Sequence, residues 1–189
     1  MTGLVGFSWN RKSWVSKVIG FFRSSYMKHP PTHTFIVFGE LLGEIIIGEA
    51  TDPRIRLCPL SKYIDNPDKK VELFEITGLA EIDKKHVCIQ LMDLVSKKYG
   101  YLQLFGFIWL WLLNKLGITA DSNPFKKDMV CSEYVYFALR EMEFRNDLLE
   151  TLEINSIAPD HIHIALTEDI RCKKVAISDF DKKELEWLR

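Results

Sequence analysis

The residue in the most distinctive chemical setting is Cys131, which stands at the start of an amphipathic stretch. Apolar residues recur from Val130 to Leu139 with the spacing of one helix face, and Asp128 just before them is a candidate N-cap. Cys131 therefore falls in the first turn of a predicted helix. There, unpaired backbone N–H groups and the positive end of the helix dipole favour a thiolate over a thiol. This setting favours a nucleophile; the alternative is a buried cysteine that acts only as a small apolar side chain.

The other three cysteines carry a weaker signal. Cys58 lies in a mixed apolar and polar run, Cys88 in a helix-like stretch, and Cys172 beside basic residues. No two of the 4 cysteines have C-x-x-C spacing, so neither a zinc site nor a redox dithiol is indicated. Scattered cysteines in a chain of this length also do not resemble a disulfide framework, which favours a reducing compartment.

A catalytic cysteine needs a base, and His33 is the strongest candidate among the 5 histidines. It follows the rigid pair Pro30–Pro31 and stands at the start of a predicted buried strand. Glu49 ends an apolar run on the next predicted strand, where an isolated carboxylate is costly unless it is paired. A hairpin that turns around residues 39–43 would place Glu49 beside His33. The residues thus predict Cys131 as nucleophile, His33 as base and Glu49 as the group that orients the imidazole.

Each of these roles has a plainer alternative. His33 could be a strand residue that is hydrogen-bonded to backbone, and Glu49 could point to solvent. His86 is expected to be an exposed helix residue. His161 and His163 alternate on a predicted surface strand, and two imidazoles with no third ligand in view are a weak indication of a metal site. No metal is therefore expected.

The elements that must position these residues follow from hydrophobic periodicity and turn signals. Strands are predicted over residues 4–7, 34–38, 44–50, 54–57, 71–77 and 160–166, and helices over 13–26, 81–98, 102–116 and 129–142. Because most strands precede most helices, the predicted fold class is α+β, with an antiparallel sheet packed against helices. The chain shows no repeat, low-complexity tract or linker, so a single domain over residues 1–189 is expected.

Charge and hydropathy narrow the function classes. A net charge of -1 gives no reason to expect nucleic acid as a partner. The N-terminus lacks the pattern of a secretory signal, and the longest apolar run, Leu102–Leu113, is shorter than the about 20 residues that span a membrane. A cytoplasmic protein is therefore expected. The aromatic run Phe105–Trp111 is expected to be mainly a buried helix, with part of it, including Trp109 or Trp111, exposed or bordering the site. Alternatively, that run could bind a hydrophobic or membrane-adjacent partner.

Four motifs together resemble a known family. They are Thr32–Phe38, Ile46–Ala50, Lys97–Tyr101 and Met129–Val135, and their order and separation resemble those of the circularly permuted papain-like hydrolases. The resemblance is to the YiiX-like branch of the NlpC superfamily, which is more distantly related to lecithin retinol acyltransferase. The histidine precedes the cysteine, which is the permuted order. The resemblance covers roughly residues 3 to 166.

This resemblance implies a permuted papain-like (NlpC-type) fold and matches Cys131 to the nucleophile, His33 to the base and Glu49 to the third member. Tyr99 matches an aromatic residue that lines the substrate site, although Gly100 stands where the family commonly has aspartate. The expected function is a cysteine hydrolase or acyltransferase that acts on an amide, ester or thioester of an acyl or peptide-like substrate through an acyl-enzyme, without a cofactor. A non-catalytic binding or interaction module on the same fold is the alternative.

Overall fold

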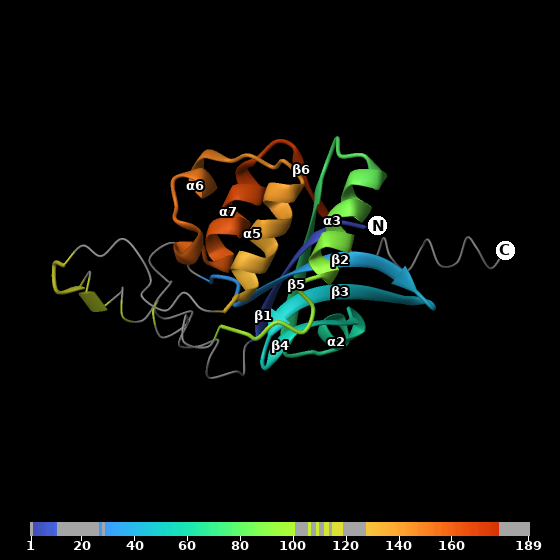
Figure 1. Ribbon diagram of the computed structural model, residues 1–189, viewed down its shortest axis with the longest axis horizontal. Coiled ribbons are helices and arrows are strands. Elements are labelled where there is room, and N and C mark those ends of the chain that lie inside the picture. Colours follow the sequence, from blue (N-terminus) through green and yellow to red (C-terminus); the bar gives the residue numbers. More distant parts are fainter. Residues whose placement is uncertain are drawn as a thin grey trace.

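The sheet is the framework of the molecule (Figure 1). The computed structural model describes residues 2–10, 27, 29–100, 106, 109, 112, 113, 115–118 and 128–177. These residues form a six-stranded sheet in the order β4-β3-β2-β1-β5-β6, in which all neighbouring strands are antiparallel. The strands are β1 (Val5–Asn10), β2 (His33–Leu41), β3 (Glu44–Thr51), β4 (Arg54–Pro59), β5 (Lys69–Ile76) and β6 (Cys172–Val175). The predicted α+β class with an antiparallel sheet is confirmed.

Helices lie on both sides of this sheet. The α-helices in the described residues include α2 (Ser61–Ile64), α3 (Glu81–Met92), α5 (Cys131–Glu141), α6 (Asp147–Glu150) and α7 (Pro159–Glu168), and η1 (Ile154–Ser156) is a short 3-10 helix. Figure 1 shows α3, α5 and α7 grouped on one side of the sheet, while α2 lies on the other side near β4.

Alternation along the strands divides the core into two clusters. On β2, Ile36 faces the larger cluster, in which the buried residues of α3, α5 and α7 pack. Phe35 and Val37 face the smaller cluster, which contains Tyr63 of α2 and Cys58 of β4. Successive residues on β2 or β3 therefore alternate between the larger cluster, where α3, α5 and α7 pack, and the smaller cluster beside α2.

The hairpin between β2 and β3 forms as predicted. Its turn is at Leu42–Gly43, where both residues have positive φ angles of 55° and 80°. The strand β2 extends past Gly39, and the pairing register shifts between Val37 and Gly39. At Gly48 an added Cβ would lie 2.2 Å from the Phe38 ring, so a side chain there would collide with its neighbour. Only glycine lets these residues approach so closely.

Three expectations about elements need correction. Residues 160–166 are not a strand but part of helix α7, and the short polar strand β6 was not predicted. The helix expected over 81–98 ends at Met92, because residues 96 and 97 hydrogen-bond to Ile55 of β4 instead, with N···O distances of 2.9 Å. Ser96 has a positive φ of 78°, which a continuing helix does not allow.

Two other expected helices fall largely on residues that are not described. The helix predicted over 13–26 lies outside the described residues. Of the helix predicted over 102–116, positions 106, 109, 112, 113 and 115 are described and are helical. Gly117 follows with a φ of 75°, as expected for a residue just past a helix C-terminus.

In the described ranges, no helix combines the length and the apolar character needed to cross a membrane.

Candidate active site

Helix α5 places Cys131 at its first residue. Val130, which precedes it, is extended, and its N–H donates to the Glu133 carboxylate at 3.2 Å. Ser132 Oγ donates to the carbonyl of Ile157 at 2.6 Å, which fixes the start of the helix against the segment before α7. The predicted helix is confirmed, whereas Asp128 lies two residues before the N-cap position and does not cap the helix.

The sheet places His33 and Glu49 together. His33 is the first residue of β2, and Gly48 of β3 pairs with Ile36, so Glu49 lies diagonally across from His33 on the same face of the sheet. His33 Nε2 is 2.7 Å from Glu49 Oε2, and the Glu49 side chain is fully buried. The predicted contact between His33 and Glu49 is confirmed, and the alternative in which Glu49 points to solvent is wrong.

Four side chains hold the Glu49 carboxylate. Besides His33, Arg56 reaches Oε1 through Nε at 2.9 Å and Nη2 at 2.8 Å, Cys58 Sγ donates to Oε1 at 3.2 Å, and the Tyr63 hydroxyl donates to Oε2. Burial alone would raise the pKa of Glu49 above 4.5, but the hydrogen bond and charge of His33, followed by Tyr63 and Cys58, hold it well below that value. Glu49 is therefore an ionised carboxylate within the sheet.

His33 links this carboxylate to the thiol of Cys131. Burial would lower the pKa of His33, but side-chain hydrogen bonds with Cys131 and Glu49, together with their charges, raise it from 6.5 to about 9. Because Nε2 contacts Glu49, Nδ1 is the ring nitrogen left for Cys131. The ring stacks on Tyr63, with a centroid distance of 5.9 Å and an interplanar angle of 9°. The imidazole is thus fixed in orientation and favoured in its protonated form.

The side chains of Cys131 and His33 contact each other at the end of the sheet. His33 has the parity of Phe35 and Val37 and therefore faces the smaller core cluster, whereas the body of α5 packs in the larger cluster. Because Cys131 is the first residue of its helix and His33 the first of its strand, their side chains reach each other where both elements begin.

The other cysteines are held as thiols. Burial and then the Glu49 charge raise the pKa of Cys58 to about 12, and burial raises the pKa of Cys88 to about 11. Burial, followed by the charge of Asp169, raises the pKa of Cys172 to about 11. A raised pKa disfavours the nucleophilic thiolate. The lower rank that the sequence assigned to these three cysteines is consistent with their surroundings.

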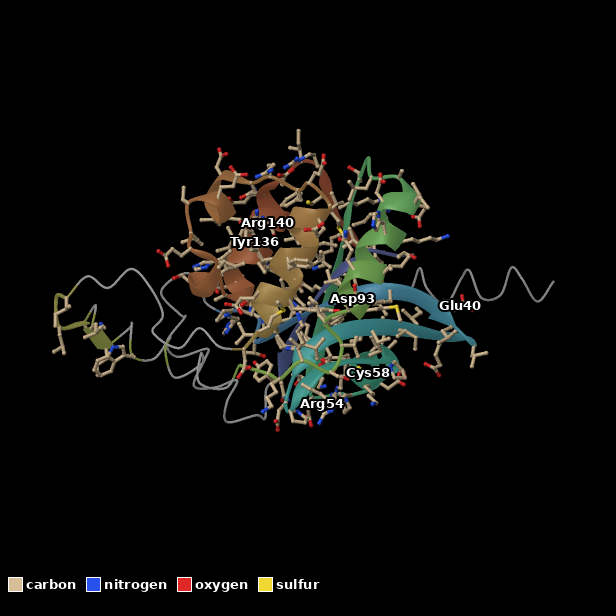
Figure 2. The ribbon with its side chains drawn as sticks, viewed as in Figure 1. Glu40, Arg54, Cys58, Asp93, Tyr136 and Arg140 are labelled. Carbon is tan, nitrogen blue, oxygen red and sulfur yellow. The ribbon has the colours of Figure 1, made fainter. Side chains whose placement is uncertain are left out.

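Three residues around Glu49 were not anticipated as parts of the site: Arg56, Cys58 and Tyr63. Arg56 and Cys58 alternate on β4 and share one face, and Arg56 pairs directly with Glu49 in the β3–β4 register. Figure 2 labels Arg54 and Cys58 along this strand. The alternation of side chains in residues 54–58 could have indicated that Arg56 and Cys58 share the face of Glu49, but only if β4 was known to pair with β3. Tyr63 comes from the four-residue helix α2, which is too short to produce a periodic pattern.

Tyr99 lies beside the start of α5 in the backbone. It forms an isolated bridge with Met129, and the N–H of Gly100 donates to the Met129 carbonyl at 3.1 Å. Tyr99 and Gly100 therefore lie beside Met129, two residues before Cys131. The side chain of Tyr99 packs partly buried against the larger core cluster, and its contact with substrate stays a prediction.

Part of the aromatic run Phe105–Trp111 is exposed, as expected. The Trp109 side chain is 49% exposed, and Leu112 and Leu116 beyond it are also exposed. Trp111 lies outside the described residues. Among the described residues of this segment, apolar side chains are therefore exposed, and a partner for them stays a prediction.

Three other histidines lie on helices α3 and α7. His86 is exposed on α3, as expected, while His161 and His163 are buried on α7 rather than lying on a surface strand. His163 Nε2 is 3.1 Å from Glu72 Oε2 and packs edge-on against Phe7. The His163 imidazole is thus packed between α7 and the sheet, whereas Nδ1 of His161 accepts from the Ala158 N–H at 3.3 Å at the start of α7.

Comparisons with known proteins inform on the fold. No model of a protein family matches the sequence, and no curated protein matches it. Among solved structures, the chain is similar to the crystal structure of the metalloprotein YiiX from Escherichia coli O157:H7. The sequence identity is 16%, the alignment covers 93% of this chain and 96% of the YiiX chain, and the TM-score is 0.51.

YiiX is described as a metalloprotein, and the described side chains of this chain differ from a metal-binding set. Within the described ranges, no three His, Cys, Asp or Glu side chains are grouped so that they could hold a metal ion. The ring of His33 is engaged by Cys131 and Glu49, which leaves no ring nitrogen free for a metal. The described residues thus do not present a metal-binding set, and the comparison establishes that this chain has a YiiX-like fold.

Proposed function

We propose that the protein is a cysteine hydrolase or acyltransferase with a permuted papain-like, NlpC-type active site. Cys131 is the nucleophile, His33 the base and later the acid, and Glu49 the orienting carboxylate. One observation carries the proposal: a single imidazole bonds both the thiol at the first residue of α5 and a buried, ionised carboxylate. This is the arrangement of an activated nucleophile, in which a base is oriented by a third group.

In the proposed reaction His33 takes the proton of Cys131, and the sulfur is then the attacking atom. Sulfur attacks the carbonyl carbon of an amide, ester or thioester, so a C–S bond forms and the bond to the leaving group breaks, while His33 gives its proton to that group. Water or a second acceptor then attacks the acyl-enzyme, returns a proton to His33 and releases Cys131. The backbone N–H of Cys131, at the start of α5, is suited to stabilise the oxyanion.

Glu49 has two tasks in this mechanism. Its negative charge stabilises the imidazolium, and its bond to Nε2 keeps Nδ1 directed at the thiol. The bonds from Arg56, Cys58 and Tyr63 hold the carboxylate still, so the imidazole does not rotate away between turnovers. The substrate is proposed to be an acyl or peptide-like compound, and the exposed Trp109 surface supports one with a hydrophobic part.

The test is selective alkylation of the four free thiols. We expect iodoacetamide near neutral pH to modify Cys131 at least about tenfold faster than the half-buried Cys172, as read for each cysteine by mass spectrometry. Glu49→Gln, which keeps the shape but removes the charge, should lower the Cys131 rate by about three- to tenfold. An equal rate at Cys131 and Cys172 in the wild type would contradict an activated nucleophile.

A second measurement separates an enzyme from a binding module on the same fold. A panel of amide, ester and thioester acyl donors, quenched and analysed by intact mass, should leave an acyl group on Cys131 and none on the Cys131→Ser variant. Release of that group by water or by an added amine would then distinguish a hydrolase from an acyltransferase. Fast alkylation without any acyl adduct would favour the binding module.

A further inference from the structure

One cation near the proposed active site, Lys69, forms no ion pair among the residues that the structure describes. Lys69, the first residue of β5, places its Nζ 3.7 Å from the centroid of the Tyr63 ring. That ring stacks on His33 and its hydroxyl binds Glu49. The ammonium is therefore one side chain removed from the imidazole that serves Cys131.

The sheet register puts Lys69 on the same face as His33. Ser8 of β1 pairs with His33 on one side and with Val71 of β5 on the other. Lys69 is two residues from Val71 and has the same parity, so it projects from the same face, one row closer to the end of the sheet. This position is at the end of the sheet where Cys131 meets His33.

Two neighbouring cations on the strands are already neutralised. Arg56 is bound to Glu49 at 2.8 Å, and Lys70, on the opposite face, is bound to Glu72 at 2.6 Å. Lys69 forms no ion pair with any carboxylate that the structure describes, and its side chain is half-buried. Burial lowers its pKa from 10.5, which reflects an ammonium that has lost part of its hydration. Such a charge gains from an anionic partner more than a fully hydrated one does.

We propose that Lys69 is a specificity-determining residue that binds a carboxylate of the substrate beside the acyl group transferred to Cys131. The inference rests on the proposed function and extends it to a substrate class: acyl donors that carry a negative charge near the scissile bond. A single ammonium acts as a point charge and suits one carboxylate, whereas a planar guanidinium would suit bidentate binding.

The test compares two alkylating reagents that differ in charge. Iodoacetate carries a carboxylate and iodoacetamide does not, so the ratio of their rates at Cys131 measures the electrostatic preference of the site. We expect Lys69→Met, which keeps an apolar chain over Tyr63, to lower the iodoacetate-to-iodoacetamide ratio by about three- to tenfold. Lys69→Arg keeps the charge and should retain most of the ratio.

The matched control is Lys62→Met. Lys62 is exposed on α2, one residue before Tyr63, so this variant removes the same charge from the same neighbourhood without touching the stacked rings. We expect a change in the ratio of less than about twofold, because exposed charges are screened by solvent and salt. A ratio that falls equally in both variants would overturn the role of Lys69, since it would show only an effect of net charge.

The two proposals fail in different ways. If Cys131 of the wild type reacts with iodoacetamide no faster than Cys172, the proposed function is wrong and this inference falls with it. If Cys131 is selectively reactive but Lys69→Met leaves the ratio at the wild-type value, the inference alone is overturned. The ratio compares the rates of two reagents on the same variant. A variant that only changes the exposure of Cys131 alters both rates alike and leaves the ratio unchanged.

Discussion

Glu49 is ionised in a fully buried position because its neighbours replace the water that it loses. Each of its oxygens has two side-chain partners, and one of those partners is Tyr63. Leaving a charged group with an unmet hydrogen bond costs more than an ordinary hydrogen bond contributes. The site therefore tolerates little change around this carboxylate, and the effect of each partner can be measured separately.

A pair of tyrosine variants tests this reasoning. Tyr63→Phe removes one donor to Glu49 and should lower the free energy of unfolding by about 1–3 kcal/mol. Tyr134, buried on α5, is the matched control, because its hydroxyl finds no hydrogen-bond partner among the described residues. Tyr134→Phe should change the free energy by less than about 0.5 kcal/mol or increase it. Urea denaturation measures both, and equal losses in the two variants would contradict the assigned role of the Tyr63 hydroxyl.

His33 makes stability depend on pH in a defined direction. Its pKa is raised in the folded protein from 6.5 to about 9, so folding favours the protonated ring. The stabilisation is therefore complete below the ordinary pKa and is lost as the pH rises through about 9. The free-energy difference between the wild type and His33→Gln should shrink by up to about 3 kcal/mol between about pH 6 and pH 10. A constant difference across that range would mean that Cys131 and Glu49 do not favour the imidazolium.

At the scale of elements, local patterns predicted the strands that carry the site better than the elements around them. The strand start at His33, the β2–β3 hairpin and the helix at Cys131 all have strong local signals in apolar runs and turn residues. The alternation of His161 and His163 was misleading, because both sides of this part of α7 are buried and a helix with few exposed residues loses its period. The strand β6 is short and polar, and only its pairing with β5, distant in the sequence, makes it a strand.

Glu72 forms ion pairs with side chains from three elements. Like Glu49, it is a buried carboxylate with a lowered pKa. His163 of α7, Lys174 of β6 and Lys70 of β5 contact its carboxylate at 3.1, 2.8 and 2.6 Å. Burial would raise the pKa of Glu72, but hydrogen bonds led by Lys174 lower it to about 2. The carboxylate form is therefore favoured by folding, and its stabilisation is present above the ordinary value of 4.5 and lost as the pH falls through about 2.

The corresponding prediction concerns the attachment of α7 and β6. Glu72→Gln should lower the free energy of unfolding by about 1–3 kcal/mol near neutral pH, and the difference from the wild type should diminish in acid. Glu75→Gln on the same strand is the control, because Glu75 is 39% exposed and bound only to Lys84 among the ion pairs described, so its loss should cost less than about 0.5 kcal/mol. Equal losses would show that burial at Glu72 adds nothing.

At the scale of the whole molecule, the sheet order ties distant parts of the chain together. The first strand, β1, lies between β2 and β5, and the last, β6, pairs with β5 at the edge. Helix α5 packs on β2 and β3, so the candidate site combines residues from both halves of the sequence. The pairing of strands that are distant in the sequence could not be predicted from local periodicity. The order of the motifs that resemble the YiiX-like proteins, by contrast, was consistent with the YiiX-like fold of the structure.

Such closure predicts that residues 1–189 unfold as one cooperative unit. Cys58 reports on the smaller core cluster and Cys88 on the larger one, because each thiol is buried in its own cluster. Brief alkylation pulses at increasing urea concentrations, under reducing conditions and with mass-spectrometric readout, measure the opening of each cluster. Wherever the chain is divided between β1 and β6, strands that pair with each other fall on opposite sides of the division. The two cysteines should therefore become reactive at the same urea midpoint, and helical circular dichroism should be lost at that midpoint too. A midpoint for Cys58 clearly different from that for Cys88 would mean that the two faces of the sheet unfold separately and that the chain is not a single cooperative domain.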